Sequence, residues 1–277
     1  MESETPRVNA LGQPIGAALA DWTPPPVPPR KAMEGRYSRI EPLDPKRHGA
    51  DLFEAFAADT EGRNWTYRIE GPFGDRAALD GWLAQISIQN DPMFFAYIDR
   101  QTGKAVGNGA FMHIDAKVGS IEVGSIMFSP LMQRSRTATE VMYLKMKRAF
   151  ELGYRRYEWK CDALNTPSRR AALRLGFSFE GVFRQATMYK ARNRDTAWYA
   201  CIDSEWPQLR DAFESWLDPS NFDGEGQQKQ SLSSLTRPIL ARAEERIEFP
   251  WLLFKTVPFP SSLPLPWSTP GRRKSPW

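Results

Sequence analysis

The spacing of apolar side chains along the middle of the chain predicts a regular order of helices and strands. Helical spacing predicts four helices, at residues 46–59, 75–88, 138–152 and 168–175. Apolar runs bounded by turn residues predict seven strands, at residues 37–43, 93–98, 105–114, 120–128, 156–162, 178–187 and 196–202. The order is an antiparallel meander, a β-α-β crossover and a hairpin. The expected fold class is therefore mixed α/β (α+β), a mostly antiparallel central sheet flanked by helices.

Proline residues divide the chain of 277 residues into three parts. Seven of the 23 prolines precede residue 31, and eight follow residue 230. Dense proline is incompatible with helix interiors and central strands, so neither end is expected to build a sheet or long helices. We expect a proline-rich arm at 1–32, a folded domain at 33–230, and a basic, proline-rich tail at 231–277.

The net charge of +4 is concentrated in that tail. Residues 231–277 hold seven basic and three acidic side chains, so the rest of the chain is balanced. A basic protein often binds nucleic acid, but an excess confined to a tail makes this the least favoured function. Trp251, Phe254 and Trp267 are candidates for docking the tail on a partner.

Composition excludes several other classes. No run approaches the roughly 18 apolar residues that a membrane-spanning helix needs, so no membrane partner is expected. The N-terminus lacks the basic and apolar segments of a secretory signal. Cys161 and Cys201 both lie in strand-like apolar stretches, which favours two buried thiols, a reducing compartment and a cytoplasmic location.

The first candidate ligand site is the junction after the strand at 120–128. Thr137 and Glu140 have the spacing of a capping box, which predicts a helix start there. A helix start presents unpaired N–H groups and a partial positive charge, and Arg134 and Arg136 add cationic donors. The junction therefore suits a phosphate or pyrophosphate, although a capped helix with solvated arginines remains the alternative.

A second helix start follows the strand at 156–162. Pro167 falls in its first turn, and Asn165 and Ser168 flank it. Both helix starts are expected at the carboxyl ends of adjacent strands, where open α/β sheets bind ligands. Asn165 is either a ligand contact or an ordinary turn residue.

These motifs, taken in order, resemble the GNAT acetyltransferase superfamily, in particular its ribosomal-protein N-acetyltransferase (RimJ/RimL-like) branch. The acyl-CoA loop of that family reads Q/R-x-x-G-x-G/A, and the chain has Gln133-x-x-Arg136-x-Ala138. The resemblance covers most of residues 33–203. Four further matches are Leu152-Gly153-Tyr154, Asn165-x-x-Ser168, Leu175-Gly176-Phe177 and Phe179-Glu180-Gly181. Arg136 replaces the usual loop glycine, so its side chain must point away from the ligand.

The resemblance implies that acetyl-CoA is the co-substrate and an amine the acceptor, with direct attack in a ternary complex. It implies that backbone amides of the loop hold the pyrophosphate, those of Gln133, Arg134, Ser135, Arg136, Thr137, Ala138 and Thr139. It implies that the strand backbone at Ile126, Met127 and Phe128 pairs with the pantetheine arm. Asn165 and Ser168 would face the pantetheine and the sulfur.

Catalytic and acceptor residues are less sharply defined. Glu122, two residues before Gly124, is either the general base or a cross-strand salt-bridge partner. Ser168 either protonates the leaving thiolate or is a helix-start hydroxyl. The tyrosine that several superfamily members use is absent from Leu175-Gly176-Phe177, and Tyr189 is a distant substitute. Aromatic residues in the connection between the first two helices are candidate walls of the acceptor pocket, namely Trp65, Tyr67 and Phe73.

Other features favour a structural role. Cys161 alternates with aromatic residues in a strand and is expected in the core. His48 and His113 lack a second ligand at metal spacing, so no metal is expected. The main alternative function is a catalytically weak acyl-CoA-binding or protein-interaction module on the same fold. A homodimer is left open by the sequence.

Overall fold

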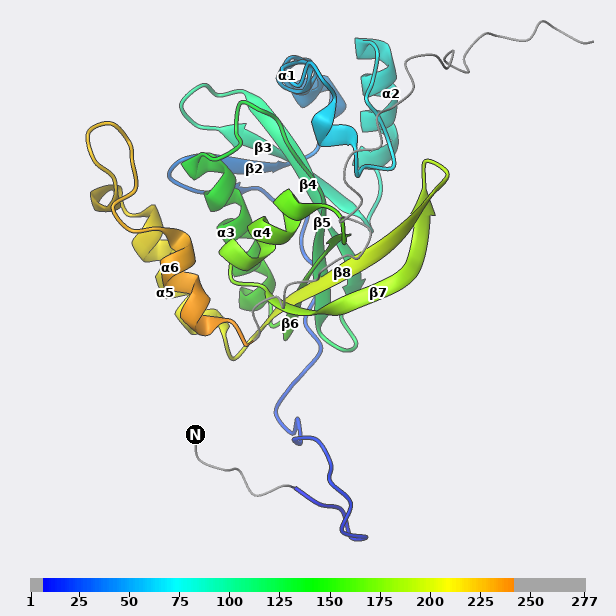
Figure 1. Ribbon diagram of the computed structural model, residues 1–277, viewed down its shortest axis with the longest axis vertical. Coiled ribbons are helices and arrows are strands. Elements are labelled where there is room, and N and C mark those ends of the chain that lie inside the picture. Colours follow the sequence, from blue (N-terminus) through cyan, green and yellow to red (C-terminus); the bar gives the residue numbers. More distant parts are fainter. Residues whose placement is uncertain (1–6, 242–277) are drawn as a thin grey trace, which may run out of the picture. The chain divides into compact units, whose positions relative to one another are not determined.

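A computed structural model of the chain describes residues 7–241, which contain an eight-stranded sheet flanked by helices (Figure 1). The strand order is β1-β2-β3-β4-β5-β6-β8-β7. The strands are β1 (Met33–Glu34), β2 (Ser38–Pro42), β3 (Met93–Asp99), β4 (Ala105–Asp115), β5 (Ser120–Phe128), β6 (Arg156–Asp162), β7 (Ser178–Tyr189) and β8 (Arg192–Ile202). The α-helices are α1 (Pro45–Ala57), α2 (Arg76–Ser87), α3 (Arg136–Glu151), α4 (Thr166–Arg174), α5 (Trp206–Leu217) and α6 (Leu232–Thr236). The predicted mixed α/β class is confirmed.

The sheet splits between its two parallel strands. All other neighbouring strands are antiparallel, but β5 and β6 are parallel and pair only from Ser120 with Arg156 to Glu122 with Glu158. Beyond Glu122 the edge of β5 that faces β6 has no strand partner within residues 7–241. Unpaired backbone groups along an edge are available to a ligand that enters between the strands.

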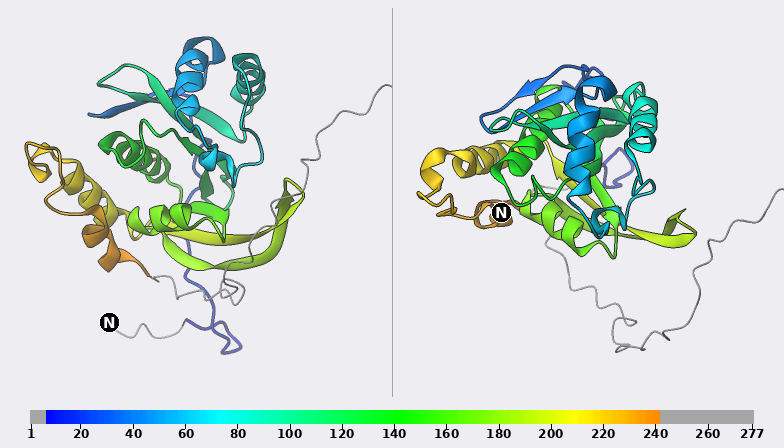
Figure 2. Two further views of the ribbon diagram at one scale, coloured as in Figure 1. Left: turned by 45° about the horizontal axis from the view of Figure 1, so that its top comes forward. Right: turned by 90° about the horizontal axis from the view of Figure 1, so that it is seen from above.

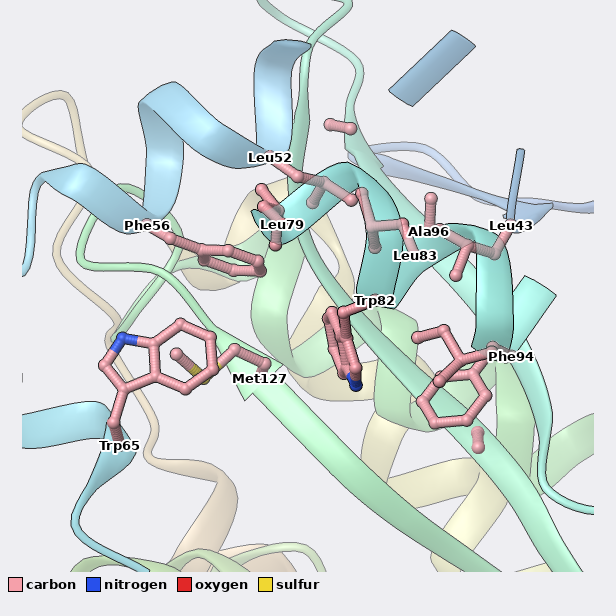
Figure 3. Packing of buried hydrophobic residues seen from close by; sticks show 13 residues of the cluster. Leu43, Leu52, Phe56, Trp65, Leu79, Trp82, Leu83, Phe94, Ala96 and Met127 are labelled. Atoms are coloured by element: carbon pink, nitrogen blue, oxygen red, sulfur yellow. The ribbon is translucent and has the colours of Figure 1, made fainter. Parts of the chain in front are cut away.

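One face of β3 and β4 is covered by α1 and α2 (Figure 1). Leu52 and Phe56 of α1 and Leu79 of α2 belong to one apolar cluster with Phe94 of β3 and Met127 of β5 (Figure 3). Alternation along a strand places every second side chain on one face, which explains why Phe94 and Ala96 share this cluster. Apolar burial on this face therefore fixes the two helices and the connection between them.

The opposite face is covered by α3 and α4. Figure 2 shows α3 (green) on the other side of β3 and β4 from α1 (blue) and α2 (cyan). Phe95 and Phe111, which alternate with the residues of the first face, pack here beneath the fully buried Lys145. Its Nζ lies 3.7 Å from the centroid of the Phe111 ring, and burial lowers the pKa of this amine well below its ordinary value.

The predicted capping box at the start of α3 is wrong. The helix begins two residues earlier, and Ser135 is its N-cap, with Oγ accepting from Ala138 N at 3.1 Å. Glu140 instead accepts hydrogen bonds from the backbone N–H groups of Arg36, Tyr37 and Ser38. Glu140 therefore binds the turn between β1 and β2, and its carboxylate is not available to cap α3 as the local spacing predicted.

Both ends of the described chain pack on the sheet domain. In the N-terminal arm Pro25 and Pro28 are buried, and Tyr154 Oη donates to the Pro26 carbonyl at 3.2 Å. At the other end Leu232 and Thr236 of α6 are fully buried. The folded unit thus extends past residue 230, while Trp251, Phe254 and Trp267 lie outside the described residues.

The hairpin of β7 and β8 is longer than predicted, because its outer half is polar and exposed and carries no apolar alternation (Figure 1). Within residues 7–241, no helix combines the length and apolarity needed to cross a lipid bilayer.

Candidate active site

Free backbone donors gather where β5 leads into α3. Among residues 7–241, the N–H groups of Arg134, Arg136 and Thr137 have no acceptor. Arg134 has φ +58°, the left-handed conformation, immediately before the N-cap. Three unpaired N–H groups at the positive end of a 16-residue helix form a site for an anion.

The other predicted loop amides are already used. Gln133 N donates to the Ser129 carbonyl at 3.1 Å, and Ser135 N donates to the Met132 carbonyl at 3.3 Å. Ala138 N and Thr139 N both bond to Ser135, to its hydroxyl and its carbonyl respectively. Of the seven amides predicted to bind pyrophosphate, only three are without an acceptor among the described residues, because the other four form hydrogen bonds within the loop and the first turn of α3.

Arg136 occupies the position of the usual loop glycine, and two aromatic rings hold its side chain. The guanidinium carbon lies 4.9 Å from the centroid of the Tyr37 ring and 4.6 Å from that of Phe222. Tyr37 belongs to the turn before β2, and Phe222 follows the 3-10 helix at Pro219–Asn221. Because the guanidinium is engaged by these rings, it does not fold back over the loop.

The side chain of Gln133 closes the end of β5 and does not reach toward a ligand. Its Nε2 donates to the Phe128 carbonyl at 2.9 Å and to Asn64 Oδ1 at 3.0 Å. Asn64 lies in the connection between α1 and α2. The loop before α3 is therefore tied to the segment expected to select the acceptor, a link that the sequence offered no signal for.

The strand β5, which was predicted to pair with pantetheine, contains a β-bulge near its carboxyl end. Met127 and Phe128 pair with Asn108 and Gly107 of β4, but the register shifts between this pair and Gly124. The residues between, Ser125 and Ile126, form a bulge, in which Ser125 has φ +49°. A bulge twists the strand locally, and here it comes where β5 leaves β6.

The second helix start lies at the end of β6, as predicted. Asn165 is the N-cap of α4, and its Oδ1 accepts from Ser168 N at 3.2 Å. The Ser168 hydroxyl accepts from Trp159 Nε1 at 3.0 Å, which orients it beside β6. Asn165 is thus the capping residue, with its side-chain NH2 group still free among the described residues.

Glu122 is an ion-pair partner on the sheet face opposite α3. Its carboxylate is 5% exposed and lies 2.9 Å from Lys160 Nζ and 2.7 Å from His113 Nδ1. The hydrogen bond to Glu122 raises the pKa of His113 above its ordinary value. A Cβ placed on Gly124 would lie 3.1 Å from Glu122 Oε1, so the carboxylate is adjacent to the bulge.

The acceptor side differs in part from the prediction. The ring of Trp65 is 3% exposed and belongs to the apolar cluster under α1 and α2, so it does not form an open pocket wall (Figure 3). Phe73 packs edge-on against it at 5.4 Å and is partly buried. Tyr67, by contrast, reaches the end of β6, where its hydroxyl donates to the Leu164 carbonyl at 3.1 Å.

Three further polar residues, Asp162, Tyr189 and Lys190, form hydrogen bonds near the end of β6 or with the connection that carries Tyr67. Tyr189 Oη donates to Asp162 Oδ2 at 2.8 Å, and burial together with Asp162 raises the pKa of Tyr189 to about 12. Lys190 Nζ donates to the Trp65 carbonyl at 2.8 Å and so joins the hairpin to the connection between α1 and α2. The sequence reading passed over Asp162, although its position at the last residue of a predicted strand was a usable signal.

This arrangement is typical of a class of protein in which an extended, anionic ligand enters between two diverging parallel strands. Within residues 7–241, three amides without an acceptor are available to an anion, and the unpaired edge of β5 is available to an extended arm. The donors present fit acetyl-CoA, whose pyrophosphate is anionic and whose pantetheine carries amide groups. The side chain at position 136, which would obstruct the loop, is held elsewhere.

Comparison with known proteins identifies the family. Residues 39–178 match the family described as acetyltransferase (GNAT) domain. The chain belongs to the GNAT acetyltransferase family, whose members transfer an acetyl group from acetyl-CoA to amines. Comparison with curated proteins gave no match.

Solved structures give the same result. A GCN5-related N-acetyltransferase from Brucella melitensis is 50% identical, with a TM-score of 0.77 over 79% of this chain and 100% of that one. A probable GNAT-family acetyltransferase from Chromobacterium violaceum is 41% identical, with a TM-score of 0.66 over 70% of this chain and 98% of that one. The Microcin C7 self immunity acetyltransferase MccE, in complex with acetyl-CoA and AMP, is 18% identical with a TM-score of 0.54 over 61% and 93%, a likeness of fold alone.

Proposed function

We propose that this chain transfers the acetyl group of acetyl-CoA to a primary amine by direct attack in a ternary complex. The observation that carries the proposal is the group of free amides at Arg134, Arg136 and Thr137 beside the unpaired edge of β5. Those amides bind the pyrophosphate, and the β5 backbone from Ile126 to Phe128 binds the pantetheine arm. Asn165 and Ser168 face the arm from the start of α4.

The chemistry depends on position and on proton removal. The thioester supplies an activated acyl carbon, and an amide of β5 near Ile126 stabilises the oxyanion formed on it. Holding the amine and the thioester together supplies much of the rate without a covalent enzyme intermediate. An alkyl amine with a pKa near 10 is only about 0.1% neutral at physiological pH, and a protein α-amine with a pKa near 8 is also mostly protonated, so the site must accept a proton from either class.

We assign proton acceptance to the Glu122 side of the site and proton donation to Ser168. Glu122 is adjacent to the bulge where the thioester would lie, and a bridging water spans the remaining distance. The Ser168 hydroxyl accepts from Trp159 Nε1 and also forms a hydrogen bond with the Cys161 thiol, and it would exchange this second contact for the leaving thiolate when it donates its proton. Both assignments derive from the placement of these groups at the two strands that diverge.

For the acceptor we favour a protein N-terminus, as in the RimJ/RimL-like branch, with small-molecule amines as the second class. The motif resemblance supports the branch, and the acidic Asp162 beside Tyr67 and Tyr189 suits a cationic amine. Because one fold serves many acceptors, the acceptor must be found by assay. The buried free thiols of Cys161 and Cys201 support a cytoplasmic location.

The test is an acetyl-transfer assay that follows free thiol. Acetyl-CoA is incubated with the protein and a panel of N-terminal peptides and small primary amines, and coenzyme A binding is measured separately by calorimetry. We expect binding together with thiol release that depends on one class of amine. Binding without release above hydrolysis would favour the weak or inactive binding module, and no binding would refute both.

A further inference from the structure

The strained residue in β4 is His113, a residue to which the sequence assigned no function. The pairing of β4 with β5 shifts between Met112 and Asp115, so that His113 and Ile114 together oppose Ile121. His113 has φ +47°, a conformation rarely adopted by residues other than glycine. The carboxylate of Asp91 holds the bulge by accepting from His113 N at 2.9 Å and Ile114 N at 3.0 Å.

The bulge changes the face to which the imidazole belongs. In a regular strand His113 would lie on the same face as Phe111, beneath α3. Instead its Nδ1 is hydrogen-bonded to Glu122 Oε2 at 2.7 Å, on the opposite face, where Glu122 pairs with Met112. Bulges next to active sites commonly re-aim a side chain in this way. The His113 side chain is 61% exposed and that of Glu122 is 5% exposed, so the pair connects a buried carboxylate to solvent.

The charges around the pair favour the imidazole as the resting place of a proton. Lys160 Nζ lies 2.9 Å from Glu122 and 2.8 Å from Glu158, and Arg156 neutralises Glu158 from the other side. A proton placed on Glu122 would break its ion pair with Lys160, whereas a proton on His113 preserves it. The groups that face the imidazole are Glu122 and Lys160 from β5 and β6, and Asp91 from the segment before β3.

We propose that His113 is the final proton acceptor of the acetyl transfer, with the Glu122 carboxylate holding its imidazole in place. This inference rests on the proposed function. The Glu122 carboxylate accepts from the Nδ1–H of His113, so Nε2 is the free basic nitrogen of the imidazole. The ammonium proton of the acceptor moves through water to Nε2, and the imidazolium then releases it to solvent. The amine nitrogen keeps the electron pair that forms the C–N bond, and the C–S pair leaves with the sulfur of coenzyme A. His113 touches neither substrate, so it is a relay and positioning residue.

The test combines histidine NMR with kinetics. The chain has two histidines, so the imidazole signal that disappears in H113Q belongs to His113, and its pKa is read from a pH titration. We expect E122Q to lower that pKa toward the ordinary value of about 6.5, because the carboxylate is lost. The acid limb of kcat/KM against pH, measured with the best amine of the panel, should follow the wild-type pKa of His113.

The variants separate the relay from a structural role. We expect H113Q to lower kcat by about tenfold or more, with a smaller change in KM, since general acid–base groups contribute at least that much. D91N keeps the imidazole and loosens the bulge, so it should lower kcat partially and retain the acid limb. K104Q, which removes an exposed ion pair with Glu54, is the matched control and should leave the profile unchanged.

Each outcome gives a decision. An acid limb that moves with the NMR pKa in E122Q supports the relay. A limb that stays in place while the NMR pKa moves, or an H113Q enzyme with the wild-type profile, overturns it and leaves the proposed function intact. A wild-type protein that transfers acetyl to no amine overturns the proposed function, and the relay with it.

Discussion

A single cation decides whether the loop before α3 can receive a phosphate. Arg136 stands where the family loop has glycine, and its guanidinium lies between the rings of Tyr37 and Phe222. Both rings lie outside residues 39–178, which match the family. Segments on either side of the family match therefore hold the arginine off the ligand site, which compensates for the missing glycine.

The first prediction concerns this clamp. In F222A the guanidinium loses one of its two aromatic contacts, each worth about 0.5–1 kcal/mol when partly exposed, and gains freedom to cover the loop amides. We expect coenzyme A to bind several-fold more weakly, measured by calorimetry. R136G removes the obstructing side chain and is the matched control, which should bind at least as well as F222A. Equal affinity of F222A and the wild type would contradict the clamp.

A second prediction at this scale concerns the two thiols. Burial raises the pKa of Cys161 to about 11 and raises that of Cys201 as well, so very little thiolate is present near pH 8. We expect Ellman's reagent to leave the native protein unmodified and to titrate two thiols after denaturation. The free thiol of coenzyme A can then be followed without interference. Rapid reaction of the native protein would show that one cysteine is accessible.

Most elements could be predicted from local pattern, and the misses have tertiary causes. The strands at 120–128 and 156–162 were predicted with their observed bounds, because apolar residues recur at alternate positions between clear turns. Glu140 matched a capping pattern but serves the turn before β2, a partner about 100 residues away. The helix α5 was missed, although Leu209, Phe213 and Trp216 carry a helical period.

The candidate site shows the same division. Motif spacing placed the two helix starts to within two residues, although it chose the wrong capping residue for α3. It could not tell which loop amides are free, because Ser129, Met132 and Ser135 accept hydrogen bonds from four of them. Neither could it find His113, whose position depends on a bulge and on the distant Asp91.

The third prediction tests the Glu140 anchor between α3 and the turn before β2. Its carboxylate is 4% exposed and accepts from three backbone N–H groups and the Ser38 hydroxyl. Replacement by glutamine adds a donor where only acceptors are useful and removes the charge. We expect E140Q to lower the free energy of unfolding by about 1–3 kcal/mol in urea titrations.

Glu151 provides the control for that measurement. It forms an exposed i,i+4 pair with Lys147 on the same helix, with an N–O distance of 3.8 Å. Such pairs contribute about 0.3–0.5 kcal/mol, so E151Q should be nearly neutral. If E140Q and E151Q had equal effects, the buried carboxylate would not be the anchor that its contacts indicate.

At the scale of the whole molecule, the sheet domain depends on chain segments from both ends. In the arm at residues 7–32, the Pro26 carbonyl accepts a hydrogen bond from the Tyr154 hydroxyl. At the other end, α6 packs against α4 and α5 and buries Leu232. Thr236 Oγ1 donates to the Arg174 carbonyl at 3.0 Å, and Ala241 N donates to Ser178 Oγ at 2.9 Å. These contacts close the end of α4 and the beginning of β7.

The last prediction compares chains truncated after residue 230 and after residue 241. The shorter chain loses the fully buried Leu232 and Thr236 and exposes the surface that they cover. Because removing a buried leucine side chain alone costs about 2–5 kcal/mol, we expect the chain ending at 230 to unfold at clearly lower urea than the chain ending at 241. L232A in the full chain should reproduce most of the loss without any truncation. Equal stability of the two truncated chains would mean that α6 rests on the domain without supporting it, and the helix start that holds Asn165 and Ser168 would then be stabilised by β6 and β7 alone.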